Sequence, residues 1–160
     1  MIIRPANEAD QSQILAIVTP TLAAGETYAI ARDLPATDIL AYWLSQGHEV
    51  FVAEDGGAIL GTYYLKANQA GGGAHVANCG YMTASAAQGK GVARAMCEHS
   101  LQRARERGFR AMQFNHVVST NQRAVALWQA LGFAVVGTLP LAFHHPTEGY
   151  VDSYVMFREL

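Results

Sequence analysis

The 160 residues carry 51% hydrophobic and 15% charged side chains, which is typical of one globular domain and not of a disordered chain. The formal net charge of −2 argues against a nucleic-acid or anionic-lipid surface, and no apolar run reaches the roughly 20 residues that span a bilayer. Two cysteines and an N-terminus without the basic and apolar regions of a signal peptide predict a cytoplasmic protein.

The first third of the chain predicts a strand and two helices. An apolar strand is expected at residues 2–6. Asn7 or Asp10 can cap the helix that follows, because both side chains accept hydrogen bonds from backbone N–H groups. A break at residues 33–37 separates this helix from a second one, which is expected to end near Gly47.

The middle of the chain predicts three strands joined by hairpins. Runs at residues 49–53 and 58–65 flank Asp55-Gly56-Gly57, and an Asp-Gly pair favours the tight turn of a hairpin. A further strand at residues 75–83 follows Gly71-Gly72-Gly73, which indicates a hairpin loop and not a linker between domains.

The last part of the chain predicts two helices that alternate with strands. The first helix opens at residues 88–93 and stops at Gly108. After a strand at residues 110–117, Thr120 caps the second helix, which has Gly132 at its C-terminal end. Two final strands are expected at residues 133–139 and 150–157. The order β-α-α-β-β-β-α-β-α-β-β predicts an α/β (α+β) domain, with a mixed sheet and helices on its faces.

The segment Gln88-Gly89-Lys90-Gly91-Val92-Ala93 joins a strand directly to a long amphipathic helix. Free N–H groups and the helix dipole attract anions to such an N-terminus, and glycines let a phosphate approach the backbone. A Walker loop is excluded because Gly91 follows Lys90, and a dinucleotide fingerprint is excluded because Arg94 takes the place of its last glycine. The remaining pattern is Arg/Gln-x-x-Gly-x-Gly/Ala, which Gln88, Gly91 and Ala93 fill.

This pattern and the order of elements resemble the GNAT family of acetyl-CoA-dependent N-acetyltransferases over nearly the whole chain. The segment from Asn121 to Phe133 adds to the resemblance, because it matches the Asn-x-x-Ala…Leu-Gly-Phe signature that follows the fifth strand of the family. The resemblance implies a single acyl-CoA N-acyltransferase domain at residues 1–160. It also implies a mostly antiparallel mixed sheet of about seven strands, splayed between the fourth and the fifth and flanked by about four helices.

The resemblance further implies acetyl-CoA as co-substrate and the residues that hold it. Backbone N–H groups of the glycine turn would bind the CoA pyrophosphate, and the end of the preceding strand would pair with the pantetheine arm. The strands at residues 75–83 and 110–117 would part to admit the thioester, and Asn121 would bond the pantetheine or thiol end. The expected cofactor-binding residues are Tyr81, Met82, Thr83, Gln88, Gly89, Lys90, Gly91, Val92, Ala93 and Asn121.

The sequence departs from the family where a base and an acid are usually found. Many members carry a Glu on the fourth strand and a Tyr in the helix after the Asn motif, but residues 75–81 hold no carboxylate and Trp128 stands at the Tyr position. An indole N–H donates a hydrogen bond but is no practical acid. The acceptor amine can instead lose its proton through ordered water, while the thiol part of the thioester leaves as a thiolate.

Four polar residues are expected to face the opening between the two parted strands: Asn78, Asn115, His116 and Asn121. An amide positions and polarises, while His116 is either a general base or a satisfied strand histidine. The set resembles the branch of the family that acetylates proline analogues such as azetidine-2-carboxylate. On that resemblance Asn115 and Asn121 are catalytic candidates, joined by His116, and Asn78 is a candidate substrate ligand. No histidine spacing indicates a metal site.

The acceptor is the part that the sequence determines least. Glu26, Tyr28 and Arg32 are candidate substrate-binding residues, because a carboxylate and a guanidinium suit the amine and carboxylate of a small zwitterion; an exposed polar loop explains the same residues. We predict acetyl transfer to a small amino-acid-like metabolite by direct attack in a ternary complex. A protein N-terminus or lysine is the alternative acceptor, and a non-catalytic acyl-CoA-binding module is the alternative function. The apolar C-terminal strands fit a homodimer or a covered sheet.

Overall fold

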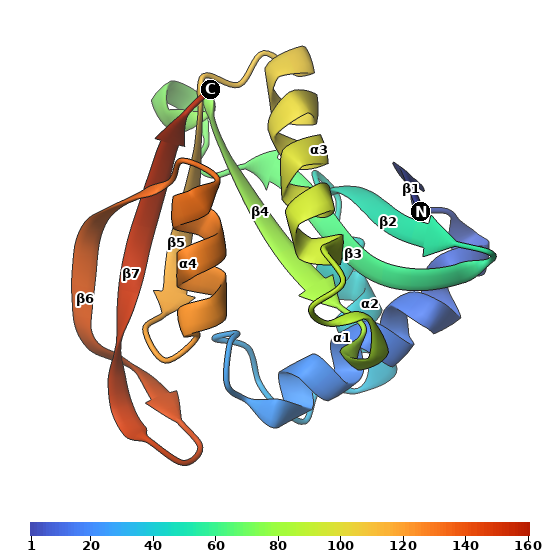
Figure 1. Cartoon of the computed structure of the whole chain (residues 1–160), viewed down its shortest axis with the longest axis horizontal. Coiled ribbons are helices and arrows are strands. Elements are labelled where there is room, and N and C mark those ends of the chain that lie inside the picture. Colours follow the sequence, from blue (N-terminus) through green and yellow to red (C-terminus); the bar gives the residue numbers. More distant parts are fainter.

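The computed structural model describes residues 1–160 and contains a seven-stranded sheet with the order β1-β2-β3-β4-β5-β7-β6 (Figure 1). The strands are β1 (Ile2–Pro5), β2 (Glu49–Asp55), β3 (Ala58–Ala67), β4 (Val76–Thr83), β5 (Ala111–Val118), β6 (Ala134–His145) and β7 (Gly149–Glu159). The helices are α1 (Gln11–Ala24), α2 (Ala36–Trp43), α3 (Val92–Glu106) and α4 (Gln122–Ala130). The predicted order of elements and the predicted fold class are both confirmed.

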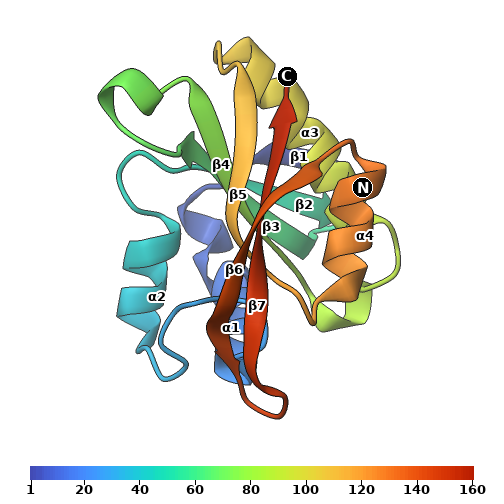
Figure 2. The ribbon, with the colours of Figure 1, turned by 90° about the vertical axis from the view of Figure 1, so that its left-hand side faces the viewer.

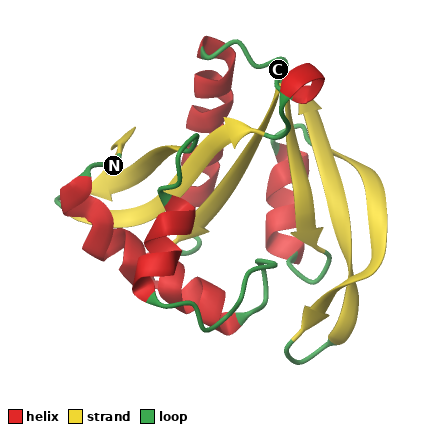
Figure 3. Ribbon diagram, turned by 180° about the vertical axis from the view of Figure 1, so that it is seen from behind, coloured by secondary structure: helices red, strands yellow, loops and turns green.

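The helices cover the two faces of the sheet in pairs. Helices α3 and α4 lie on one face, where Met96 and Trp128 belong to a core cluster of 19 buried residues (Figure 1). Helices α1 and α2 lie on the other face, where Ile14 and Trp43 belong to a second cluster of 10 (Figure 3). The sheet is therefore buried on both faces, and β4 contributes to both clusters through alternate side chains, with Cys79 in the first and Met82 in the second.

Neighbouring strands pair antiparallel, with the exception of β4 and β5. Those two strands are parallel and pair only at Val76 with Ala111 and at Ala77 with Met112. From there they diverge, as Figure 1 shows at the end nearest the start of α3. Residues 78–83 of β4 and 113–118 of β5 do not pair with each other, and we call the gap between them the wedge. The splay expected between the fourth and fifth strands is thus present.

The ends of several elements differ from those that the sequence predicts. Asn121, and not Thr120, is the N-cap of α4, because its side-chain oxygen accepts a hydrogen bond of 3.3 Å from the N–H of Ala124. Asn7 caps a short 3-10 turn directly before α1. Its own N–H donates to the Asp10 carboxylate, which completes a capping box. Strand β6 continues to His145, since pairing with β7 resumes after an irregularity at Leu139. The long β6–β7 hairpin extends beyond the rest of the sheet (Figure 2).

None of the helices has the length and apolar character that crossing a bilayer requires.

Both cysteines are free and buried. Burial raises the pKa of the Cys79 thiol to about 12, so this thiol is unsuited to react as a thiolate and carry an acyl group.

Candidate active site

The glycine turn before α3 presents a set of free backbone donors. Gly89 and Gly91 have φ angles of 76° and 79°, a left-handed conformation that favours glycine, and Gly91 is the N-cap of α3. The first turn of α3 contains no acidic residue and no side-chain cap. The positive end of the helix dipole is therefore uncompensated, which favours an anion there.

The hydrogen bonds of the turn decide which of its N–H groups are available. The main-chain nitrogens of Gly89, Gly91, Val92 and Ala93 make no hydrogen bond within the protein, and neither does that of Arg94. The N–H of Lys90, in contrast, donates to the oxygen of Ala87 at 3.3 Å. Of the expected backbone donors, that of Lys90 is therefore already used within the turn, and the N–H of Arg94 is a further free donor. The exposed side chain of Lys90 remains free to meet an anion.

Arg123 lies beside this turn and was not expected from the sequence. A Cβ atom built at Gly89 would lie 3.8 Å from Nη2 of Arg123, so the guanidinium of the first turn of α4 approaches the turn before α3. Arg123 is exposed and forms no ion pair or hydrogen bond with another side chain. Its place in the Asn121 motif is the one signal that could have drawn attention to it.

The main chain of β4 presents alternate residues to the wedge. Asn68 donates to the oxygen of Val76 and Ala84 donates to that of Leu60, so even-numbered residues of β4 face β3. The oxygen of His75 accepts from Arg110, so odd-numbered residues face β5. Beyond Ala77, the groups that face the wedge are those of Cys79, Tyr81 and Thr83. The main chain of Met82, which was expected to pair with pantetheine, faces β3.

Tyr28 reaches the wedge from the connection between α1 and α2. Its hydroxyl donates a hydrogen bond of 2.9 Å to the main-chain oxygen of Tyr81. Its ring lies 6.4 Å from that of Trp43, centroid to centroid. Burial of the hydroxyl, followed in size by the nearby Tyr42, raises the pKa of Tyr28 well above its ordinary value, so the phenol stays neutral.

Asn78 lies where the paired part of β4 ends. Its side chain is 8% exposed, and its amide nitrogen donates a hydrogen bond of 2.9 Å to the main-chain oxygen of Gln113 across the start of the wedge. Asn115, two residues farther along β5, is exposed. Its amide accepts from the Gln113 side chain at 2.9 Å and donates to that of Asn68 at 2.6 Å. A chain of amides thus crosses from the β3–β4 loop to β5.

His116 lies in an irregularity of β5, between Phe114 and Val117, where the pairing with β7 shifts. Its ring packs edge-on against Phe143 of β6, with centroids 5.9 Å apart. Its Nδ1 atom is buried and has no hydrogen-bond partner in the protein. A buried, unpaired ring nitrogen is uncommon in proteins and indicates a missing partner.

Two residues of the Asn motif have different structural roles. Asn121 uses its side-chain oxygen to cap α4, while its amide nitrogen makes no hydrogen bond within the protein. Trp128 belongs to the core, where its ring lies 5.1 Å from Tyr81 and 5.2 Å from Phe114. The family's usual Tyr position is therefore filled by a packing residue.

The remaining acceptor candidates lie on the α1–α2 connection. Glu26 is exposed and forms no ion pair. Arg32 folds back against Gly25, and its Nε atom donates to the oxygen of Ala23 at 2.8 Å. Arg32 thus also closes the C-terminal end of α1, a role that the sequence does not indicate.

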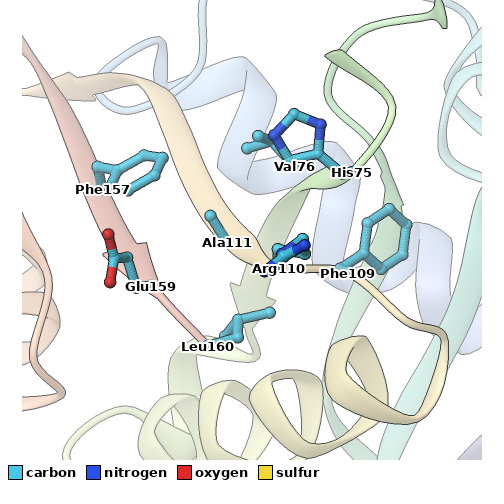
Figure 4. A pocket seen from close by; sticks show the side chains of 8 residues that line it. All are labelled: His75, Val76, Phe109, Arg110, Ala111, Phe157, Glu159 and Leu160. Carbon is cyan, nitrogen blue, oxygen red and sulfur yellow. The ribbon is translucent and has the colours of Figure 1, made fainter. Parts of the chain in front are cut away.

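A large surface hollow lies away from these residues. A depression of about 800 Å³ is found where β4 and β5 begin and β7 ends, lined in part by His75, Arg110 and Glu159 (Figure 4). That is the paired end of the two strands, opposite the glycine turn. Since neither free backbone donors nor the wedge reach it, we place the candidate site at the wedge and not in this hollow. Nowhere in the protein do three or more His, Cys, Asp or Glu side chains gather as metal ligands would.

Comparison with known proteins gives a consistent result. The model of the acetyltransferase (GNAT) family matches residues 19–133. The N-acetyltransferase aca1 of Schizosaccharomyces pombe is 33% identical over 99 residues, which is 61% of this chain and 47% of the yeast protein. The chain thus matches about half the length of that relative.

Solved structures extend the similarity over the whole chain. A GCN5-related N-acetyltransferase from Kribbella flavida is 45% identical, with a TM-score of 0.95 over 99% of this chain and 97% of that one. A phosphinothricin acetyltransferase from Sinorhizobium meliloti, solved in complex with acetyl-CoA, shares the fold at 23% identity, with a TM-score of 0.86 over 99% of this chain and 88% of that one. The chain therefore belongs to the GNAT family of acetyl-CoA-dependent N-acetyltransferases.

Proposed function

We propose that residues 1–160 form one acyl-CoA N-acyltransferase domain that moves the acetyl group of acetyl-CoA to the amine of a small amino-acid-like metabolite. The proposal rests on one observation: the pairing of β4 with β5 stops after Ala77 and Met112, so that an unpaired edge of β4 leads to the free N–H groups before α3. An acyl-CoA needs both features, because its extended arm can pair with the free strand edge while its phosphates bind the free N–H groups. Both partners bind together, and the amine attacks directly.

Each part of the donor has a counterpart in the structure. The free N–H groups of the glycine turn suit the pyrophosphate, and the unpaired guanidinium of Arg123 adds a charge beside them. The main chains of Tyr81 and Thr83 suit the amide groups of the pantetheine arm. The free amide nitrogen of Asn121 suits a carbonyl nearer the thiol end.

The reacting groups would meet within the wedge. The amine nitrogen attacks the thioester carbon, the C–S bond breaks, and the thiolate leaves and is then protonated. No carboxylate lies on β4 to take the amine proton, and the ring of His116 is half-buried. We propose His116 as the general base, acting on the amine directly or through one water from its Nε2 atom, because the Nδ1 atom is enclosed by the protein. Asn78 lies at the narrow end of the wedge, where its carbonyl oxygen is available to the substrate.

The acceptor class rests on two charged residues of the α1–α2 connection. Glu26 is exposed and unpaired, and the Nη groups of Arg32 are not used in the bond to Ala23. A carboxylate and a guanidinium on one short connection suit the two charges of an amino acid. The small net charge of −2 favours such a metabolite over basic protein tails, which a strongly acidic protein would attract.

The proposal is tested by incubating the protein with acetyl-CoA and a panel of acceptors while free thiol is followed. The panel contains primary and cyclic secondary amino acids, polyamines, and peptides with a free N-terminus or a lysine. We expect turnover with one or more amino acids and little with the peptides. Preferential turnover of peptides would overturn the acceptor class, and CoA binding without turnover on any amine would overturn the enzymatic function.

A further inference from the structure

The hydrogen bond between Tyr28 and Tyr81 joins two parts of the site that the proposed function keeps separate. Tyr28 belongs to the α1–α2 connection, on the acceptor side, whereas the Tyr81 carbonyl belongs to the unpaired edge of β4, on the donor side. The views in Figure 1 and Figure 3 agree that this connection extends toward the open end of the wedge. The Tyr28 hydroxyl is therefore the side-chain group that links acceptor loop and donor strand.

The Tyr28 side chain packs against buried residues of the core between α2 and the sheet. Its ring packs against Trp43, whose indole N–H donates to the Thr62 hydroxyl at 3.0 Å. The Thr62 hydroxyl in turn donates to the oxygen of Phe51 at 2.9 Å. Trp43 and Thr62 are fully buried. The hydroxyl of Tyr28 is thus placed at the wedge by the core on the α2 face, and its position does not depend on a mobile side chain.

The direction of the hydrogen bond determines what the hydroxyl can still do. A phenol has one proton and an oxygen that also accepts hydrogen bonds. The proton of Tyr28 is committed to the Tyr81 carbonyl, which cannot donate. The oxygen can therefore only accept from a third group. A neutral amine supplies that group, since it carries N–H donors beside the lone pair that must stay free for attack.

We propose that Tyr28 is a positioning residue for the acceptor amine, and that its oxygen accepts one N–H of the amine while the nitrogen lone pair points at the thioester carbon. The inference rests on the proposed function. A primary amine has two N–H groups, one for Tyr28 and one for the base. A cyclic secondary amine has a single N–H, which the base requires. Tyr28 therefore favours primary over secondary amines.

Burial keeps this group in the form that the role requires. Because the pKa of Tyr28 is raised well above its ordinary value, the phenol keeps its proton at neutral pH. Tyr28 is therefore not the base, and its proton, donated to the Tyr81 carbonyl, is not placed to act as the acid. Its contribution is orientation, which appears in the kinetics of the amine and leaves the binding of acetyl-CoA unchanged.

The test compares Tyr28→Phe with Tyr42→Phe. Tyr42 is a matched control, because its hydroxyl also makes one hydrogen bond, of 3.2 Å to the Tyr64 hydroxyl, and its ring also packs against Trp43 at 6.4 Å. We expect Tyr28→Phe to lower kcat/KM for a primary amine about 5- to 10-fold, the effect of one lost hydrogen bond. The Kd for CoA, the thermal midpoint and the slow hydrolysis of acetyl-CoA by water should match those of Tyr42→Phe.

The outcomes separate this inference from the proposed function. A wild-type protein that releases no thiol with any amine overturns both. An active wild-type protein with Tyr28→Phe kinetics equal to those of Tyr42→Phe overturns the inference alone. A Tyr28→Phe variant that loses CoA affinity or acetyl-CoA hydrolysis in parallel with amine turnover also overturns it, because Tyr28 then supports the donor strand and does not orient the amine.

Discussion

The side chain of Asn78 and the main chain of Gln113 are joined by a hydrogen bond of 2.9 Å across the gap between β4 and β5. Backbone pairing of the two strands ends one residue earlier, at Ala77 and Met112. The amide therefore takes the place of the next backbone hydrogen bond, and it determines where the wedge begins.

Asn78→Ala should destabilise the protein and impair turnover. The change leaves the Gln113 carbonyl without its partner at a buried position, which costs about 1–3 kcal/mol of the free energy of unfolding. Urea denaturation measures this loss. Asn115→Ala serves as the stability control, because that amide is exposed and its removal should cost less than about 0.5 kcal/mol. Equal losses in the two variants would contradict the role of Asn78 at the start of the wedge.

Gly91→Asp should abolish measurable CoA binding. It places a carboxylate where the pyrophosphate is expected, and like charges about 4 Å apart near a protein surface repel by several kcal/mol, or about 100-fold or more in affinity. Gly56→Asp is the matched control, since Gly56 also has a left-handed φ, of 57°, and open space around it, but lies in the β2–β3 turn. Both variants should lose about 1 kcal/mol of stability to backbone strain. Calorimetric titration with CoA should distinguish them, and unchanged affinity in Gly91→Asp would refute the phosphate site.

Arg123→Ala should weaken CoA binding by about 10-fold or more, because a charge-assisted hydrogen bond to phosphate is lost. The effect should shrink at high salt, which screens exposed charges. Arg105→Ala is the control, since Arg105 is likewise exposed and unpaired but lies near the C-terminal end of α3. Titration with 3′-dephospho-CoA identifies the phosphate concerned: the two proteins should differ equally for both ligands if Arg123 binds the pyrophosphate. Equal affinities of Arg123→Ala and Arg105→Ala for CoA would count against any contact.

His116→Gln should lower kcat by about 100-fold if His116 is the base, with little change in the KM for acetyl-CoA. His144→Gln is the control, because His144 is exposed on the neighbouring hairpin and stacks on Tyr150 at 4.6 Å. A His116→Gln variant that keeps the wild-type kcat would show that water alone accepts the proton.

Asp10 should stabilise the fold at neutral pH but not in strong acid. Arg4 donates to its carboxylate at 2.7 and 2.8 Å, and this pairing, opposed by burial, lowers the pKa of Asp10 from the ordinary value of 3.8. A lowered pKa means that the contribution is complete above 3.8 and is lost as the pH falls through the folded value. Asp10→Asn should therefore have a lower thermal midpoint than the wild type at pH 7, and the difference should shrink as the pH falls below 3.8. A difference that persists unchanged in acid would contradict the ionic origin of the effect.

Local patterns in the sequence predict the elements and the cofactor turn because their causes are local. The Asp55-Gly56-Gly57 turn, whose glycines adopt positive φ angles, requires no information from the rest of the chain. The same holds for the left-handed Gly89 and Gly91, which leave backbone donors free. Even here one detail escapes, since the N–H of Lys90 is used by Ala87 within the turn and no pattern of residue types reveals that.

The contacts that define the site arise from tertiary packing and could not be predicted in the same way. Tyr28 and Tyr81 are separated by 53 residues, and their hydrogen bond depends on how α2 packs on the sheet. Arg123 approaches Gly89 because α3 and α4 share one face. The helix cap was misplaced at Thr120 because Thr and Asn are both good caps; the structure selects Asn121 through its bond to Ala124.

The two backbone pairings between β4 and β5 divide the sheet into a four-stranded half, β1 to β4, and a three-stranded half, β5, β7 and β6. The first half carries α1, α2 and α3, the second carries α4, and the polypeptide passes from one half to the other once, between α3 and β5. The two fragments, 1–106 and 111–160, are held together by these two pairings and by the core cluster under α3 and α4. A ligand that lies in the wedge touches both fragments at once. Acetyl-CoA would thus add contacts between them on the side of the sheet where the backbone pairing is missing.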